Sequence, residues 1–181
     1  MKTNVKFAKI KSEAKIPSKR KEDMAFDIYA CFEENYIVIA PNETRLIPTG
    51  IASSCEPEYG FLLRERGSTG SKGIALRCGV IDSGYRNEWF VGWTNTTDKE
   101  IVISKLDKIK TATLMTSNDF FKFDLSEEDV DKCIIFYPYS KAIAQALVIP
   151  VPEVEVEELA YEDLKAIPSE RGLGALGSSG K

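Results

Sequence analysis

Residues 79–89 read GVIDSGYRNEW, and this stretch decides more about the fold than any other part of the chain. A short apolar run ends at Asp82, a turn follows at Ser83 and Gly84, and Tyr85 and Arg86 come directly after it. A carboxylate at the end of a strand is held rigidly and stays close to a turn, as a general base requires. The alternative is that Asp82 only opens a β-turn.

Runs of β-forming residues surround this stretch and are separated by turn residues such as Pro41-Asn42 and Pro48-Thr49-Gly50. Their spacing is typical of a sandwich or barrel of antiparallel strands, and we predict an all-β fold. The predicted strands are residues 5–10, 26–29, 36–39, 44–47, 60–64, 88–94 and 142–151.

Residues 96–139 interrupt this rhythm and are predicted to be an insertion. Within it, LSEEDVDKC predicts a short helix that Ser126 caps. The segment also carries aromatic side chains among charges, so it could bind another protein. The alternative is a hairpin and a helix that only decorate the surface. The aromatic residues are Phe120, Phe121, Phe123 and Tyr137.

The sequence divides into three parts: a β domain at 1–152, an acidic linker at 153–170 and a glycine-rich arm at 171–181. The linker is either a solvated segment or a short amphipathic helix. The arm, RGLGALGSSGK, cannot bury a core, so it is either a disordered terminus or a segment whose N–H groups and hydroxyls wrap phosphates.

Composition excludes several classes of function. The 181 residues are 43% hydrophobic and 29% charged with a net charge of −4, which disfavours stable nucleic-acid binding. Histidine is absent, so no Ser/His/Asp triad or histidine-liganded metal can form. The four cysteines are far apart, as expected of reduced thiols in the cytoplasm. Neither a membrane span nor a secretory signal is expected.

GVIDSGYR resembles the third motif of the trimeric dUTPase family, and stretches similar to the other four motifs occur in the family's order. Some phage members of the family carry extra segments at a similar place, between motifs three and four. The resemblance implies a jelly-roll-like homotrimer that hydrolyses dUTP to dUMP and pyrophosphate at sites between subunits, with the tail of one subunit closing over another's site. The four further stretches are AKIPSKRKEDMAFDIYA (14–30), YGFLLRERGSTGSKGI (59–74), AIAQALVIP (142–150) and RGLGALGSSG (171–180).

The same resemblance implies roles for individual residues. Asp82 would be the general base, Tyr85 would pack on the deoxyribose, and Asp27 would hold Mg²⁺ through a water. The hairpin at 73–79, with Gly79 and Ile81, would read uracil through backbone groups, and Leu176 would cover the base. The phosphate contacts would be Arg66, Ser68, Gln145, Arg171, Ser178 and Ser179.

Four residues depart from the family pattern. Gly67 stands where a serine usually follows the motif-two arginine, and Leu176 replaces the aromatic residue of the tail. Asn87 and Ala142 replace a glycine and an arginine. Two other functions stay open: a dCTP deaminase on the same fold, which would use a glutamate such as Glu88, and a regulatory protein that binds a partner through the insertion.

Overall fold

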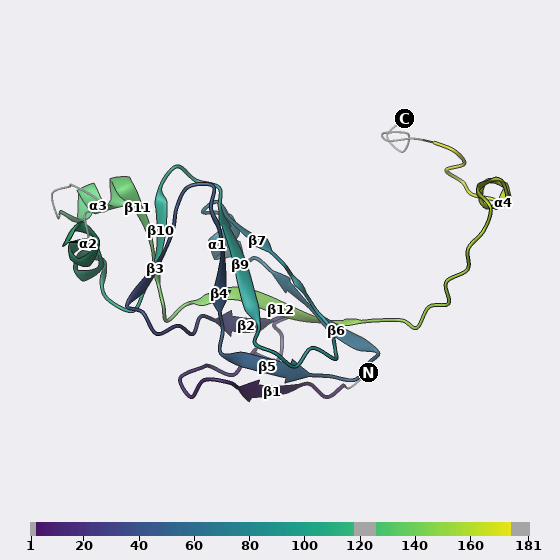
Figure 1. The fold of residues 1–181 in the computed structure, drawn as a ribbon, viewed down its shortest axis with the longest axis horizontal. Helices are drawn as coiled ribbons and strands as arrows, with labels where there is room; N and C mark the ends of the chain where they lie inside the picture. The colour runs from purple at the N-terminus through teal and green to yellow at the C-terminus, as the bar shows by residue number, and fades with distance from the viewer. Residues whose placement is uncertain (1–2, 118–125, 175–181) are drawn as a thin grey trace. The chain divides into compact units, whose positions relative to one another are not determined.

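The computed structural model describes residues 3–117 and 126–174, and the fold is mostly β, as the sequence predicts (Figure 1). The chain forms two compact units, 1–151 and 152–181, which are described separately. The first unit holds four small sheets that pack as a sandwich of the jelly-roll type. Their strands, in order across each sheet, are β1 (Lys6–Lys9) and β5 (Ile51–Ser54); β11 (Ile134–Pro138), β10 (Glu100–Ser104) and β3 (Tyr36–Ile39); β2 (Phe26–Tyr29), β12 (Ala142–Pro150), β6 (Tyr59–Arg64) and β8 (Val80–Ile81); and β4 (Thr44–Pro48), β9 (Phe90–Asn95) and β7 (Ile74–Arg77).

The core lies between the sheets and is built by the alternation of apolar side chains along the strands. Phe61 and Trp89 meet edge to face with ring centroids 4.9 Å apart, and Phe7 packs against both rings. Aromatic pairs in this geometry contribute packing beyond the area that they bury. Trp89 is therefore held in the core directly before β9. Residues 82–88, which precede it, form a turn that we call the Asp82 turn.

Strand β12 is the central positioning element of the site because it pairs with β2 on one edge and with β6 on the other. Its Gln145 lies opposite Asp27 on β2 and opposite Arg64 on β6. Three segments that are far apart in the sequence are thereby brought to one end of the same sheet.

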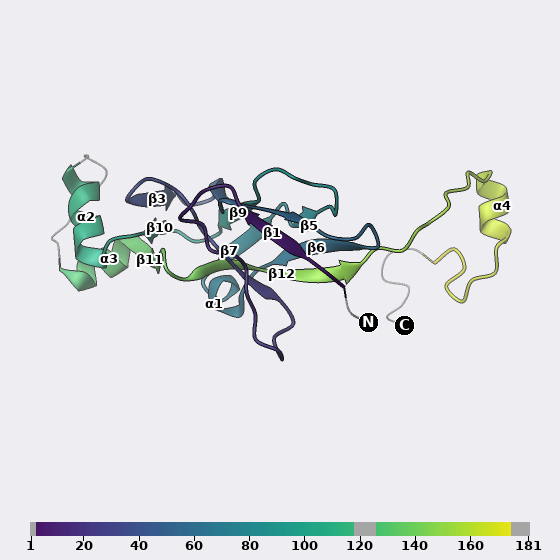
Figure 2. The same ribbon diagram turned by 90° about the horizontal axis from the view of Figure 1, so that it is seen from below.

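The predicted insertion contains two helices, α2 (Lys108–Ser117) and α3 (Glu127–Cys133), between strands β10 and β11. These two strands are parallel, so the expectation of an added hairpin is wrong. The predicted cap is confirmed, because the Ser126 hydroxyl accepts a hydrogen bond from the Asp129 N–H at 3.2 Å. Figures 1 and 2 show the two helices packed together beside β10 and β11. A separate apolar cluster holds them there and comprises Val102, Ala112, Met115, Val130 and Ile134.

The second unit contains one short helix in its described part, α4 (Tyr161–Ala166), which has no buried residue. The acidic segment is helical only at these six residues, whereas residues 153–160 are exposed and form no regular secondary structure, as expected of a solvated linker. Arg171 Nε donates to the Gly174 carbonyl at 3.2 Å, whereas Leu176, Ser178 and Ser179 lie outside the described residues. No helix in the described ranges is long and apolar enough to cross a membrane.

Candidate active site

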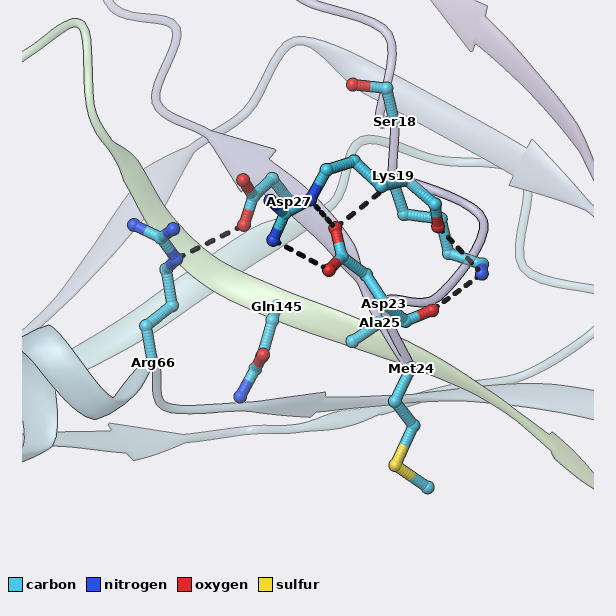
Figure 3. Close-up of a pocket in the computed structure, with 9 residues that line it drawn as sticks. Ser18, Lys19, Asp23, Met24, Ala25, Asp27, Arg66 and Gln145 are labelled. Carbon is cyan, nitrogen blue, oxygen red and sulfur yellow. Dashed lines mark hydrogen bonds and ion pairs between the residues drawn. The ribbon is translucent and has the colours of Figure 1, made fainter.

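Three of the predicted site residues line one cleft of about 540 Å³, which we call the Asp27 cleft (Figure 3). Asp27 comes from β2, Gln145 from β12, and Arg66 from the chain two residues after β6. The cleft is open to solvent and is lined mainly by polar groups. Its full lining is Ser18, Lys19, Arg20, Asp23, Met24, Ala25, Asp27, Arg66 and Gln145.

The three predicted residues are held in place by direct contacts. Arg66 Nε lies 3.1 Å from Asp27 Oδ1, and a second guanidinium nitrogen donates to the Ala142 carbonyl at 3.4 Å. Gln145 Nε2 donates to the Glu65 carbonyl at 2.7 Å. The guanidinium is therefore fixed between a carboxylate and a strand end, with N–H groups still directed to the cleft.

Arg66 owes its position to the short helix α1 (Gly67–Gly70), which it caps. The buried Thr69 hydroxyl donates to the Arg66 carbonyl at 2.9 Å and accepts from the Arg66 N–H at 3.1 Å. Ser68 is exposed on α1 and does not line the Asp27 cleft. Thr69 is not marked by the sequence, because an arginine N-cap followed three residues later by a threonine does not match the usual capping-box pattern.

The Asp82 turn is braced from within and from β5. The Tyr85 N–H donates to the Asp82 carbonyl at 3.1 Å, and the Tyr85 hydroxyl donates to the Glu88 carbonyl at 3.0 Å. Arg86 donates to the Ser53 carbonyl at 3.2 Å, which ties the turn to β5. Among the described residues, no side chain pairs with the exposed Asp82 carboxylate. The carboxylate is thus open to solvent at the surface of the turn.

Asp82 and Tyr85 are not part of the Asp27 cleft. The register places Ile81 opposite Phe61 on β6, whereas Gln145 lies opposite Arg64 on the same strand. Asp82 therefore lies next to Gly60, four residues along β6 from the Gln145 row, a separation of about 13 Å along the strand. Within one chain, the general-base candidate and the phosphate-binding candidates form two separate groups.

The predicted base-reading hairpin is fixed to β6. Leu63 N–H donates to the Gly79 carbonyl at 2.6 Å, and a Cβ built at Gly79 would lie 2.7 Å from the Leu63 carbonyl oxygen. Only glycine fits this close approach. The Ile81 side chain is buried in the core, so only its backbone is available to a ligand. Cys78 adopts a φ of 56°, which turns the chain sharply between β7 and β8.

Two of the three cations that line the Asp27 cleft are paired with carboxylates, Arg66 with Asp27 and Arg20 with Asp23. Arg20 donates to Asp23 from two guanidinium nitrogens, each at 2.9 Å, and these bonds hold the pKa of Asp23 below its usual range. Burial raises the pKa of Tyr137, whose hydroxyl donates to the Ala142 carbonyl that Arg66 also contacts. Ser18, Lys19, Arg20 and Asp23 were not predicted as site residues, although they lie inside the stretch that resembles the first motif.

The carboxylate chemistry of the cleft fits a magnesium ion that a triphosphate carries in. Mg²⁺ usually binds one or two carboxylates and keeps phosphate oxygens and waters as its other ligands. Asp27 offers such a carboxylate, and Asp23 lies in the same cleft. In the described ranges, no group of three or more Cys, Asp or Glu residues could form an all-protein metal cage.

The family model for dUTPase matches residues 12–125, which is more than half of the chain. This chain belongs to the dUTPase family. The deoxyuridine 5'-triphosphate nucleotidohydrolase of Nautilia profundicola is 31% identical over 181 residues, covering 98% of this chain and 99% of the relative. That of Paraburkholderia xenovorans is 26% identical over 186 residues, covering 100% and 99%.

Solved dUTPase structures share the fold. The dUTPase of Staphylococcus bacteriophage 80alpha, solved with dUpNHpp, superposes with a TM-score of 0.68 at 23% identity, covering 98% of this chain and 99% of that one. The dUTPase from phage phi11 of S. aureus, whose structure visualizes a species-specific insert, gives a TM-score of 0.61 at 20% identity, covering 86% and 96%. The predicted fold class and family are both confirmed.

Proposed function

We propose that this dUTPase-family chain hydrolyses dUTP to dUMP and pyrophosphate. The observation that carries the proposal is the Asp27 cleft, in which Arg66 and Gln145 offer donors to phosphate oxygens beside a carboxylate suited to Mg²⁺. The named activity of the Nautilia and Paraburkholderia relatives supports it over nearly the whole chain.

In the proposed mechanism, Asp82 takes a proton from a water that attacks the α-phosphorus in line, and pyrophosphate leaves. The Asp82 carboxylate, which has no side-chain partner in the described part of the chain, and its braced turn suit this role. Arg66 and Gln145 stabilise the charge that develops on the phosphate oxygens. The Tyr85 ring packs on the deoxyribose and leaves no room for a 2′-hydroxyl, so ribonucleotides are rejected.

Asp27 would hold the Mg²⁺ of the bound nucleotide through a water, with Arg66 fixing the orientation of its carboxylate. When bound, this ion would neutralise phosphate charge. The glycine-rich arm would close the site, with Leu176 over the base and with Arg171, Ser178 and Ser179 on the phosphates.

We further propose a cytoplasmic homotrimer in which the Asp82 turn of one subunit faces the Asp27 cleft of another. The separation of the two groups within one chain supports this arrangement. An exposed apolar surface near the turn supports it too, because Val80 is 73% exposed and Phe90 is 39% exposed. Light scattering should give three times the monomer mass, and Val80→Glu should reduce it.

Two other functions are weaker. Glu88 would be the candidate glutamate of a deaminase, but its Oε1 accepts a hydrogen bond from the Gly50 N–H at 2.7 Å and is already committed to holding β5. A partner-binding role for the insertion was expected from four aromatic residues and does not exclude hydrolysis. Tyr137 is buried and unavailable to a partner, whereas Phe120, Phe121 and Phe123 lie outside the described residues. A pull-down with a variant carrying alanine at exposed positions of α2 and α3, such as Lys110 and Glu128, would locate such binding without removing the crossover between β10 and β11.

The decisive experiment measures pyrophosphate release by the wild type and by Asp82→Asn, with Mg²⁺ and separately with dUTP, dTTP, dCTP and UTP. We expect release from dUTP alone and its loss in the variant, whose carboxamide keeps the shape but cannot accept the proton. Ammonia release from dCTP would indicate the deaminase. Lack of turnover of every nucleotide would refute the enzymatic proposal.

A further inference from the structure

The loop before Asp27 forms a small closed hairpin over the Asp27 cleft. Ser18 pairs with Asp27 at its base, where the Asp27 N–H donates to the Ser18 carbonyl at 3.0 Å. At its tip, the Asp23 N–H donates to the Arg20 carbonyl at 3.2 Å. The backbone of this loop is therefore fixed on the same strand end that carries Asp27.

Its side chains are fixed as well. The Asp23 carboxylate accepts two guanidinium hydrogen bonds from Arg20 and a third from the Arg20 N–H at 3.1 Å. Asp23, and to a lesser extent Asp27, raises the pKa of Arg20, so both carboxylates lie near its charge. The Lys19 ammonium donates to the Asp23 carbonyl at 2.6 Å and to the Arg20 carbonyl at 3.4 Å. Figure 3 shows both hydrogen bonds of the Lys19 ammonium as dashed lines within the loop.

The charges of the cleft do not cancel. Arg66 is paired with Asp27 and Arg20 with Asp23, whereas the hydrogen bonds of the Lys19 ammonium within the described residues go to main-chain carbonyl oxygens. The Phe26 ring, with its centroid 5.8 Å from Lys19 Nζ, carries no charge. Lys19 is thus an ordered cation without an ion-pair partner in the described ranges, on the wall of a cleft that holds two arginines. A polyanion is the ligand that this arrangement attracts.

We propose that the loop at residues 18–25 is a cationic clamp on the phosphate chain of the nucleotide, with Lys19 as its principal binding residue and Arg20 as the second. This inference rests on the proposed function for the identity of the nucleotide, but not for the binding of a polyphosphate. Asp23 is a positioning residue, because it holds the Arg20 guanidinium against the loop.

The chain provides a matched control. Lys21 follows Arg20 in the same loop and is exposed, but it does not line the Asp27 cleft. Lys19→Ala and Lys21→Ala therefore remove the same charge from the same loop at positions that differ in their access to the cleft. Lys19→Arg restores the charge and tests rescue.

Two measurements test the clamp. Calorimetry with Mg²⁺ and inorganic tripolyphosphate measures binding without hydrolysis of a nucleotide, and steady-state kinetics with dUTP separates KM from kcat. For Lys19→Ala we expect weakening of tripolyphosphate binding and a rise in KM of about five- to tenfold each, with kcat changed less. The salt dependence of binding should become shallower, since one cation is lost. Lys21→Ala should match the wild type, and Lys19→Arg should recover most of the loss.

Equal effects of Lys19→Ala and Lys21→Ala on tripolyphosphate binding would overturn the clamp, because they would indicate only a general effect of net charge. The wild type could fail to hydrolyse dUTP while Lys19→Ala, but not Lys21→Ala, loses tripolyphosphate binding. That result would refute the proposed function and support the clamp. The reverse result is hydrolysis of dUTP by the wild type with no selective loss of tripolyphosphate binding in Lys19→Ala. It would support the enzymatic function and refute the clamp.

Discussion

The Arg66 guanidinium lies 3.1 Å from the Asp27 carboxylate, and this contact joins the end of β6 to β2 across the Asp27 cleft. Both side chains are partly exposed, so the pair contributes little to folding stability. Its significance is positional: it presents a fixed fork of N–H donors next to the carboxylate that suits Mg²⁺.

Arg66→Gln should lower kcat/KM for dUTP about 100-fold, because a donor aimed at developing phosphate charge is lost from the site. The control is Arg64→Gln, two residues earlier, where the side chain is 60% exposed and pairs with Glu65. It should stay within about threefold of the wild type, as expected for a surface ion pair. Comparable losses in the two variants would contradict the role given to Arg66.

Gly79→Ala should destabilise the fold by about 1–3 kcal/mol, since a new Cβ must displace either its own hairpin or the β6 backbone. The nearest obstacle is the Leu63 carbonyl oxygen at 2.7 Å. Gly84→Ala is the control, because a Cβ there meets nothing within 4 Å. Urea unfolding of both variants measures the difference, and equal midpoints would show that the close approach at Gly79 is not required.

Met115→Ala should lower the free energy of unfolding of the α2–α3 segment by about 2–4 kcal/mol, because it leaves a cavity in the apolar cluster that holds the two helices. Leu114→Ala, at a neighbouring and 37% exposed position, should cost much less. Hydrogen exchange of α2 and α3 detects the local loss, while dUTP hydrolysis should be unchanged in both variants. A parallel loss of hydrolysis would mean that the insertion supports the site.

Glu100→Gln should stabilise the protein by about 1 kcal/mol at neutral pH, because Glu100 Oε2 is buried without a hydrogen-bond partner in the described part of the chain. Burial raises the pKa of Glu100, and the Glu43 carboxylate raises it further. The folded chain therefore binds this proton more tightly than the unfolded chain, and wild-type stability falls as pH rises through the window that begins near the ordinary value of 4.5.

The measurement for Glu100 is the difference in melting temperature between Glu100→Gln and the wild type from about pH 4 to about pH 8, a range that spans the ordinary carboxyl pKa and neutrality. The difference should be smallest at the acid end and should grow toward neutrality. Glu22→Gln, on an exposed loop, serves as the control for a simple change of net charge. A gain in stability that does not vary with pH would argue against an ionised, desolvated Glu100.

Much of the fold and part of the site follow from local sequence pattern. Runs of β-forming apolar residues predict β3 and β12, and the Ser126 cap is a local signal that the structure confirms. The grouping of Asp27, Arg66 and Gln145 follows from the family's motif order rather than from local pattern, because it depends on how β12 pairs with both neighbours.

Other features depend on long-range geometry that no local pattern contains. β5 was not predicted, because its sequence IASS is short and contains two serines. The parallel pairing of β10 and β11 was hidden inside the predicted insertion, since strand direction is decided by tertiary packing. In the sequence, Lys19 and Arg20 have the pattern of ordinary surface charges. Their position at the cleft depends on the pairing of Ser18 with Asp27.

The parallel alignment of β10 and β11 limits how short the connection between these strands can become. A chain leaving β10 must travel back along the whole strand before it can enter β11 in the same direction, and such a return takes a dozen or more residues. The exposed faces of α2 and α3 can vary freely in sequence, but the connection cannot be trimmed to a tight turn. A chain that lost both helices would therefore keep the parallel pairing of β10 and β11 only if about a dozen residues still spanned the return.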